Sequence, residues 1–207
     1  MHEPFTRKRN RLPKFDYAQS GAYFVTVCTQ GRRRVFWQDD TVDTTPVAAH
    51  SVRHSPPQPE GLPVGEEPQP EIHLAPLPPE RTFSPAGRIV VEMVRQIPRR
   101  YPAVTVDACA VMPNHVHLLL QIHSGEDGRP QSAPTVSHVV KQWKEAVTKC
   151  LGEPLWQKSF HDHVIRGAAG YQMIWNYIDS NPATWRKDCF YTVSYTHLRA
   201  HETLSDL

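Results

Sequence analysis

The 207-residue sequence predicts an α+β fold, in which an antiparallel sheet carries helices on one face in the ferredoxin-like plan. Two apolar, β-branched runs flank the turn signal Pro113-Asn114 and predict a central hairpin. Stretches with helical apolar periodicity alternate with further strand-like runs, which gives the element order β-α-β-β-α-β-α. A chain of this length needs only one core, so we expect a single domain over 1–192.

Each element has a local pattern behind it. Aromatic and β-branched residues predict the first strand over 22–29. Ser84 and Pro85 are typical of an N-cap and a first helical residue, and the apolar positions after them predict a helix ending near Pro98. The remaining elements are expected, in order, as strands over 104–112 and 115–122, a helix capped by Thr135 or Ser137, a strand over 155–166 and a helix over 168–181.

Two segments depart from this pattern. Residues 42–83 hold half of the 20 prolines, few large apolar side chains and an excess of acidic residues. Such a segment buries too little apolar surface to order itself, so we interpret it as a disordered Pro-rich insertion rather than a subdomain.

The sequence from about residue 193 resembles a peptide translated from sequencing adapter, so 193–207 is interpreted as a non-native tail. A genuine C-terminal extension is the alternative.

Composition argues against a membrane or secreted protein. No run of about 18 apolar residues is present, so no membrane span is expected. The segment Met1-His2-Glu3-Pro4 lacks the apolar stretch of a signal peptide. The four cysteines lie far apart without zinc-binding spacing, which favours reduced thiols. We therefore expect a cytoplasmic protein, either a monomer or a homodimer.

Basic residues gather in two clusters and on one helix, although the formal net charge is only +2. Such clusters suit the phosphate backbone of nucleic acid, whereas a solvated basic surface is the alternative for each single residue. Arg166 has a further alternative, an ion pair with Asp162. The candidate DNA-binding residues are Arg7, Lys8, Arg9, Arg11, Arg32, Arg33, Arg34, Lys141, Lys144 and Arg166.

The pair His115-Val116-His117 is the most informative feature of the sequence. Successive side chains of a strand point to opposite faces, so the two imidazoles point the same way and Val116 points toward a core. Two imidazoles on one face of a rigid strand supply part of a metal site. The alternative is an exposed histidine pair on a half-buried strand.

A second candidate group lies on the last expected helix. Tyr177 and Asn181 are four residues apart, so their side chains lie one above the other on the flank of the apolar stripe. A phenol and an amide oxygen could then approach one metal-bound phosphate. A tyrosine at the edge of the core and a C-cap asparagine stopped by Pro182 are the alternative. Tyr171 competes as a nucleophile, but it lies in the apolar stripe and is expected in the core.

The order of several motifs resembles the REP-associated tyrosine transposases, single-tyrosine proteins of the HUH endonuclease class. The motifs are Met112-Pro113-Asn114-His115-Val116-His117, Leu155-Trp156-Gln157, His163-Val164-Ile165-Arg166, Tyr177-Ile178 and Asn181-Pro182. The resemblance covers roughly residues 7–41 and 84–190. The single His-x-His motif is unspecific, whereas the ordered set is specific. The Pro-rich insertion departs from the compact form of the family.

The resemblance implies the HUH endonuclease fold, with the histidine pair on a central strand. It also implies a metal-dependent endonuclease and strand transferase for single-stranded or hairpin DNA. His115, His117 and Asn181 would hold Mg²⁺ or Mn²⁺, and Tyr177 would form a 5′-phosphotyrosine intermediate. Two alternatives remain open: a catalytically silent DNA-binding protein, and a metal-dependent phosphohydrolase that the histidine pair alone would allow.

A second His-x-His sequence, His161-Asp162-His163, is a rival metal pair. Members of the family carry a second aromatic residue where His161 stands, and His163 matches their histidine. His163 is then expected to support the site or the structure. The sequence leaves metal binding by this second pair as an open alternative.

Overall fold

The computed structural model describes residues 20–38, 71–123 and 134–191. A five-stranded sheet has the strand order β3-β5-β6-β1-β7. Its strands are β1 (Gly21–Cys28), β3 (His73–Leu74), β5 (Val104–Val111), β6 (His115–Ile122) and β7 (His161–Ile165). Strands β5, β6, β1 and β7 pair antiparallel with one another in that order, so β6, the second strand of the hairpin, lies between β5 and β1. This confirms the ferredoxin-like order that the sequence predicts.

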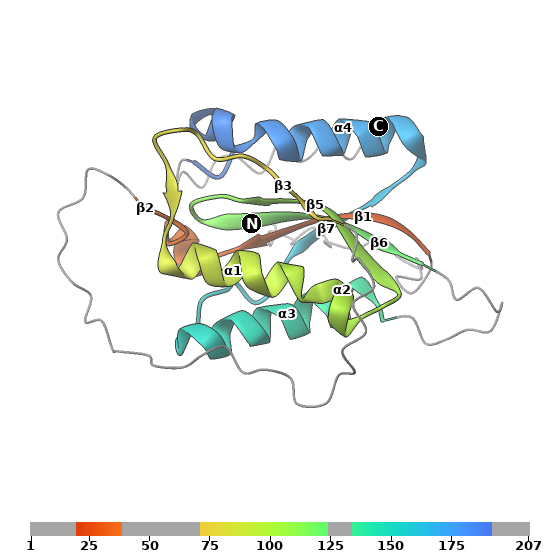
Figure 1. Cartoon of the computed structure of the whole chain (residues 1–207), viewed down its shortest axis with the longest axis horizontal. Coiled ribbons are helices and arrows are strands. Elements are labelled where there is room, and N and C mark those ends of the chain that lie inside the picture. The colour runs from red at the N-terminus through yellow and green to blue at the C-terminus, as the bar shows by residue number, and fades with distance from the viewer. Residues whose placement is uncertain (1–19, 39–70, 124–133, 192–207) are drawn as a thin grey trace, which may run out of the picture.

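Helices cover both faces of the sheet (Figure 1). The helices α1 (Pro85–Arg95), α2 (Ile97–Arg100) and α3 (Val136–Leu151) lie on one face, and α4 (Gly167–Ser180) lies on the other, so the expectation that all helices share one face is corrected for α4. The reason is visible in β1, where Tyr23 and Val25 belong to one buried cluster and Phe24 to the other. A strand that is apolar on both sides needs cover on both sides.

Local sequence signals place the helix ends. The side chain of Ser84 accepts from the backbone N–H of Gly87, and Thr135 accepts from that of His138, so both predicted caps are confirmed. Gly152 ends α3 in the left-handed conformation, with φ of 74°. The helix of Ser84 stops at Arg95, before Pro98, which lies in the short α2.

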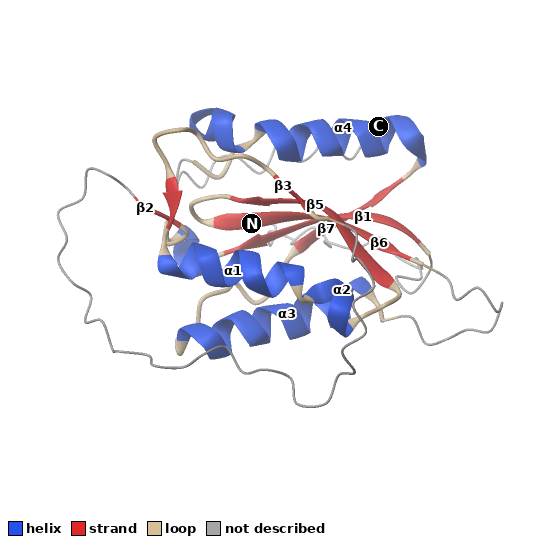
Figure 2. Cartoon of the chain, in the orientation of Figure 1, coloured by secondary structure: helices blue, strands red, loops and turns tan. Residues whose placement is uncertain are grey.

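Some elements differ from the sequence expectation. The expected strand over 155–166 is a strand only at its end, as β7, because polar Gln157, Lys158 and Ser159 interrupt the alternation. Residues 71–83 of the expected insertion take part in the fold. Their strand β3 pairs in parallel with β5 at the sheet edge, and β4 (Thr82–Phe83) pairs with β2 (Trp37–Gln38) in a small second sheet (Figure 2).

Residue His73 of β3 ties this edge to α4. Its Nε2 lies 2.8 Å from Oδ1 of Asp179, and its ring stacks on Trp175 with centroids 5.0 Å apart. The rest of the expected insertion, 42–70, and the expected tail, 193–207, lie outside the described residues. Within the described ranges, none of the helices has the length and apolar character to cross a bilayer.

Candidate functional site

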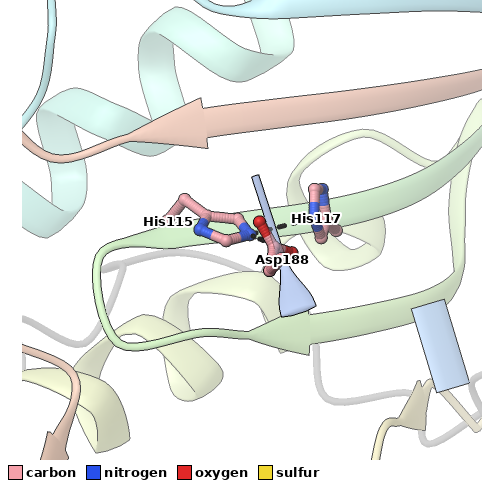
Figure 3. A group of neighbouring side chains, drawn as sticks. All are labelled: His115, His117 and Asp188. Carbon is pink, nitrogen blue, oxygen red and sulfur yellow. Dashed lines mark hydrogen bonds and ion pairs between the residues drawn. The ribbon is translucent and has the colours of Figure 1, made fainter. Parts of the chain in front are cut away.

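Strand β6 presents both histidines of the His-x-His motif toward α4. His115 and His117 are fully buried, and their Nε2 atoms lie 2.9 Å apart (Figure 3). The strand begins directly after the Pro113-Asn114 turn, as the sequence predicts. The ring of His117 stacks on Phe24 of the neighbouring strand, with centroids 5.1 Å apart. The two nitrogens that face each other are therefore held by a packed sheet.

Asn114 determines which nitrogen of His115 carries the proton. Its Nδ2 donates to the carbonyl oxygens of Phe190, at 3.0 Å, and Arg32, at 3.4 Å. The amide oxygen must therefore be the atom that faces Nδ1 of His115, at 2.9 Å, and it can only accept. It follows that Nδ1 of His115 is the donor, so when the ring is neutral its Nε2 offers a lone pair toward His117.

Thr26 holds His117 in the same way from the adjacent strand. Its Oγ1 lies 2.9 Å from Nδ1 of His117, and the hydroxyl can either donate or accept. When His117 carries its proton on Nε2, that N–H points at the lone pair of His115. When the proton is on Nδ1, both Nε2 atoms present lone pairs to one point, which is the arrangement of two imidazole ligands around a cation.

Asp188 is the third member of this cluster. One ligand atom from each of His115, His117 and Asp188 lies within 4.8 Å of the others, and Figure 3 shows the carboxylate beside both imidazoles. The Asp188 side chain is 2% exposed, and its Oδ2 is 3.9 Å from Nε2 of His115. Burial raises the pKa of this carboxyl above its usual range, against hydrogen bonds from Phe190 and Asn181 that lower it.

The donor set fits a divalent cation. In the described part of the chain, Oδ2 of Asp188 and Oδ1 of Asn181 are buried without a hydrogen-bond partner. Buried polar oxygens of this kind are costly unless something pairs with them. Two imidazole nitrogens and one carboxylate are a common ligand set for divalent transition metals.

Tyr177 lies beside the pair, on α4. Its hydroxyl is 3.5 Å from Nε2 of His117, and its ring packs against that imidazole with centroids 5.3 Å apart. Burial raises the pKa of the phenol well above its usual range, and the charge of Asp188 raises it further. A side-chain hydrogen bond with Asn181 acts in the opposite direction. The structure thus brings Tyr177, Asn181 and both histidines together.

Tyr171 has a different environment from Tyr177. Its hydroxyl donates to Oδ2 of Asp107 at 2.7 Å, and burial together with this bond raises the pKa of the phenol to about 12. Asp107 is on β5, so this tyrosine joins α4 to the sheet.

The rival sequence His161-Asp162-His163 lies on the edge strand β7. In register, His161 is opposite Thr26 and His163 is opposite Phe24, so both face the α4 side of the sheet. His161 is exposed, and burial together with the charge of Arg166 lowers the pKa of His163. Among the described residues, this pair belongs to no cluster of three metal-ligating side chains.

The candidate DNA-binding residues are divided between the two faces. Arg32 lies over the ring of Phe190, and Arg34 lies over that of Tyr191, both 4.7 Å from the centroid and both near the site. Arg33 instead contacts Glu153 at 3.7 Å. Lys141 and Lys144 are on α3, on the opposite face of the sheet from Tyr177 of α4. Arg166 is exposed and directly precedes the first residue of α4.

Arg7, Lys8, Arg9 and Arg11 lie outside the described residues. Sequence reasoning missed Asp188, Thr26 and the role of Asn114 beyond its turn. The turn signal did mark Asn114, but only the fold shows its bond to His115. Asp188 follows the 3-10 helix η2 (Pro182–Lys187) and belongs to no sequence motif.

The chain is similar to known proteins at low sequence identity. No family model matches it. An uncharacterized protein of Haemophilus influenzae is 23% identical over 204 residues, covering 89% of this chain and 93% of that protein. A REP-associated tyrosine transposase bound to a REP hairpin is similar with a TM-score of 0.47 and 18% identity, over 84% of this chain and 74% of that chain. A candidate transposase from Deinococcus radiodurans has a TM-score of 0.38 and 17% identity, over 82% and 95%.

Proposed function

We propose that this protein is a metal-dependent endonuclease and strand transferase for single-stranded DNA, of the single-tyrosine transposase type. One observation supports it most. The hydroxyl of Tyr177 lies 3.5 Å from Nε2 of His117, within a buried group that also contains His115 and Asp188. A nucleophile beside a metal-ligand set is what a phosphoryl-transfer site requires. The motif order that resembles the REP-associated tyrosine transposases points to the same chemistry.

Tyr177 would act by covalent catalysis. Its phenolic oxygen forms a bond to the phosphorus of the scissile phosphodiester, and the bond from phosphorus to the 3′ oxygen breaks. The phenol releases its proton to water, and the departing 3′ oxygen takes one up. The products are a 5′-phosphotyrosine and a free 3′-OH. Because the phosphodiester energy is retained in the adduct, a 3′-OH from a second strand can reverse the step and join two DNA ends.

The residues that would hold the metal are His115 and His117, with Asp188 supplied by the segment after η2. When bound there, Mg²⁺ or Mn²⁺ would supply positive charge for the non-bridging oxygens of the phosphate. The resemblance also implies Asn181 as a ligand. Its side chain hydrogen-bonds with those of Tyr177 and Asp188, and its Oδ1 is buried without a hydrogen-bond partner. We therefore keep Asn181 as a further ligand candidate.

Covalent trapping tests the proposal. A hairpin-bearing single strand is labelled at its 3′ end, incubated with the protein and Mn²⁺, and denatured. The label should stay on the wild-type protein, because a 5′-phosphotyrosine retains the 3′ part of the strand. Tyr177→Phe should bind DNA but give no adduct. Tyr171→Phe, the matched control on the same helix, should keep the adduct, because its hydroxyl bonds to Asp107 and Gln121 and not to the proposed ligands.

Other results would redirect the proposal. An adduct that persists in Tyr177→Phe and maps to another residue would overturn the mechanism. DNA binding without any adduct in the wild type would indicate the silent DNA-binding protein. Metal-dependent turnover of small phosphate esters without an adduct on DNA would indicate the phosphohydrolase.

A further inference from the structure

A basic and aromatic groove lies next to the histidine site. Two adjoining pockets, of about 70 and 310 Å³, share Trp37, Arg81, Trp185 and Arg186 in their walls. The walls come from β2, from the loop before β4 and from η2. The larger volume is in the range of pockets that hold a small ligand such as one nucleotide.

Charge in the groove is mostly positive. Its lining includes Arg34, Arg81, Arg186 and Lys187, against the single carboxylate of Glu80. Arg186 and Lys187 are exposed, and within the described ranges neither is in an ion pair. Uncompensated cations that converge on a concave surface attract an anion such as a phosphate.

Aromatic rings also line the groove, and contacts hold them in place. The indole N–H of Trp37 donates to the carbonyl oxygen of Val111 at 2.6 Å. Trp185 packs edge-on against Tyr191, with centroids 5.3 Å apart, and lies 6.3 Å from the ring of Trp37. Fixed aromatic surfaces beside cations are the combination that binds unpaired bases of single strands.

Trp185 connects the groove to the proposed catalytic site. Its ring centroid lies 5.9 Å from that of His115, so one tryptophan borders both places. Asp188 follows Trp185 three residues later along the chain. The groove therefore lies within one side chain of the histidine pair.

We propose that this groove binds one unpaired nucleotide of the DNA strand, next to the scissile phosphate. Arg186 and Lys187 contact its phosphate, and the base lies against the wall of Trp37, Trp185 and Tyr191. This inference rests on the proposed function, because it takes its strand from the same substrate. The groove would then set which strand position is placed at Tyr177.

A binding experiment without cleavage tests the groove separately from the chemistry. Tyr177→Phe protein is titrated in EDTA against fluorescent single-stranded oligonucleotides that carry one abasic site, moved along the strand. Loss of the base at one position should weaken binding about tenfold, as expected for one stacked base. Adding Arg186→Ala and Lys187→Ala should remove that position dependence. It should also reduce the slope of log Kd against log salt by about 0.7, as expected for the loss of one neutralised single-strand phosphate.

A matched pair of substitutions controls for net charge. Arg95→Ala with Arg99→Ala removes two exposed cations from α1 and α2, which lie on the far side of the sheet. These changes should leave the abasic profile and the salt slope unchanged. A flat abasic profile, or equal effects of both pairs, would overturn the groove assignment even when wild-type protein forms the adduct. A normal profile without any adduct would instead retain the groove and reject the chemistry.

Discussion

The side-chain oxygen of Asn114 lies 2.9 Å from Nδ1 of His115, and the opposite end of the same amide donates to the carbonyl oxygen of Phe190 at 3.0 Å. Asn114 therefore determines which nitrogen of His115 carries a proton, and it also anchors the segment that carries Asp188 through the bond to Phe190. Partners of this kind raise ligand basicity and orient the ring.

Two substitutions of Asn114 separate its role as acceptor for His115 from its role as donor to Phe190. Asn114→Ala should reduce Mn²⁺ affinity about 10- to 100-fold, because His115 loses the acceptor that keeps its proton on Nδ1. Asn114→Asp keeps that acceptor and should retain affinity, although it loses the donor to Phe190 and lowers the melting temperature. Isothermal titration calorimetry measures the affinity, with the exposed Asn176→Ala of α4 as control. Equal affinities for the Ala and Asp variants would contradict this role.

The histidine pair offers a second prediction. From sequence, substitution by Ala is expected to remove ligands without affecting folding. Both rings are fully buried, and the ring centroids of His115 and Phe190 lie 4.5 Å apart. His115→Ala and His117→Ala therefore leave cavities in the core in addition to removing ligands. We expect loss of the covalent adduct and a lower melting temperature. His138→Ala, exposed on α3, should change neither quantity. Adduct formation at the wild-type rate in either variant would place the metal site elsewhere.

The boundary of the Pro-rich segment leads to a third prediction. Replacing residues 41–69 with about ten Gly and Ser residues should leave the melting temperature nearly unchanged, since loop length has a weak effect on stability. Extending the deletion through 82 should lower it. That longer deletion removes the pairing of β3 with β5 and the contact of His73 with Asp179. Thermal unfolding followed by circular dichroism distinguishes them, and equal melting temperatures would show that residues 71–82 contribute little.

Gly87 in α1 is the subject of the fourth prediction. A Cβ at this position would lie 2.2 Å from the carbonyl oxygen of Phe36, a backbone atom that cannot move aside alone. Gly87→Ala should therefore destabilise the protein by about 1–3 kcal/mol, the usual cost of overpacking. At Gly170 of α4 the nearest atom would be a methyl carbon of Ile165 at 3.6 Å, an ordinary contact. Gly170→Ala should be neutral or stabilising, and urea unfolding of both variants gives the comparison.

Periodicity alone accounts for several features of the site. The two-residue repeat of a strand places His115 and His117 on one side, and the helical spacing places Asn181 one turn beyond Tyr177. Both placements are found in the structure. The caps at Ser84 and Thr135 were predictable for the same reason, because each depends on a bond to a residue three positions away.

Only the tertiary structure decided which distant residues meet at these local features. Tyr177 is sixty residues from His117, and their contact depends on α4 crossing to the face of the sheet that α1 and α3 leave open. Asp188 joins the histidines because η2 turns the chain back over them, although no sequence motif marks it. Local patterns follow from the geometry of one helix or strand, which a few neighbouring residues specify. A shared site depends on how whole elements bury their apolar faces, and that packing is settled by the complete fold.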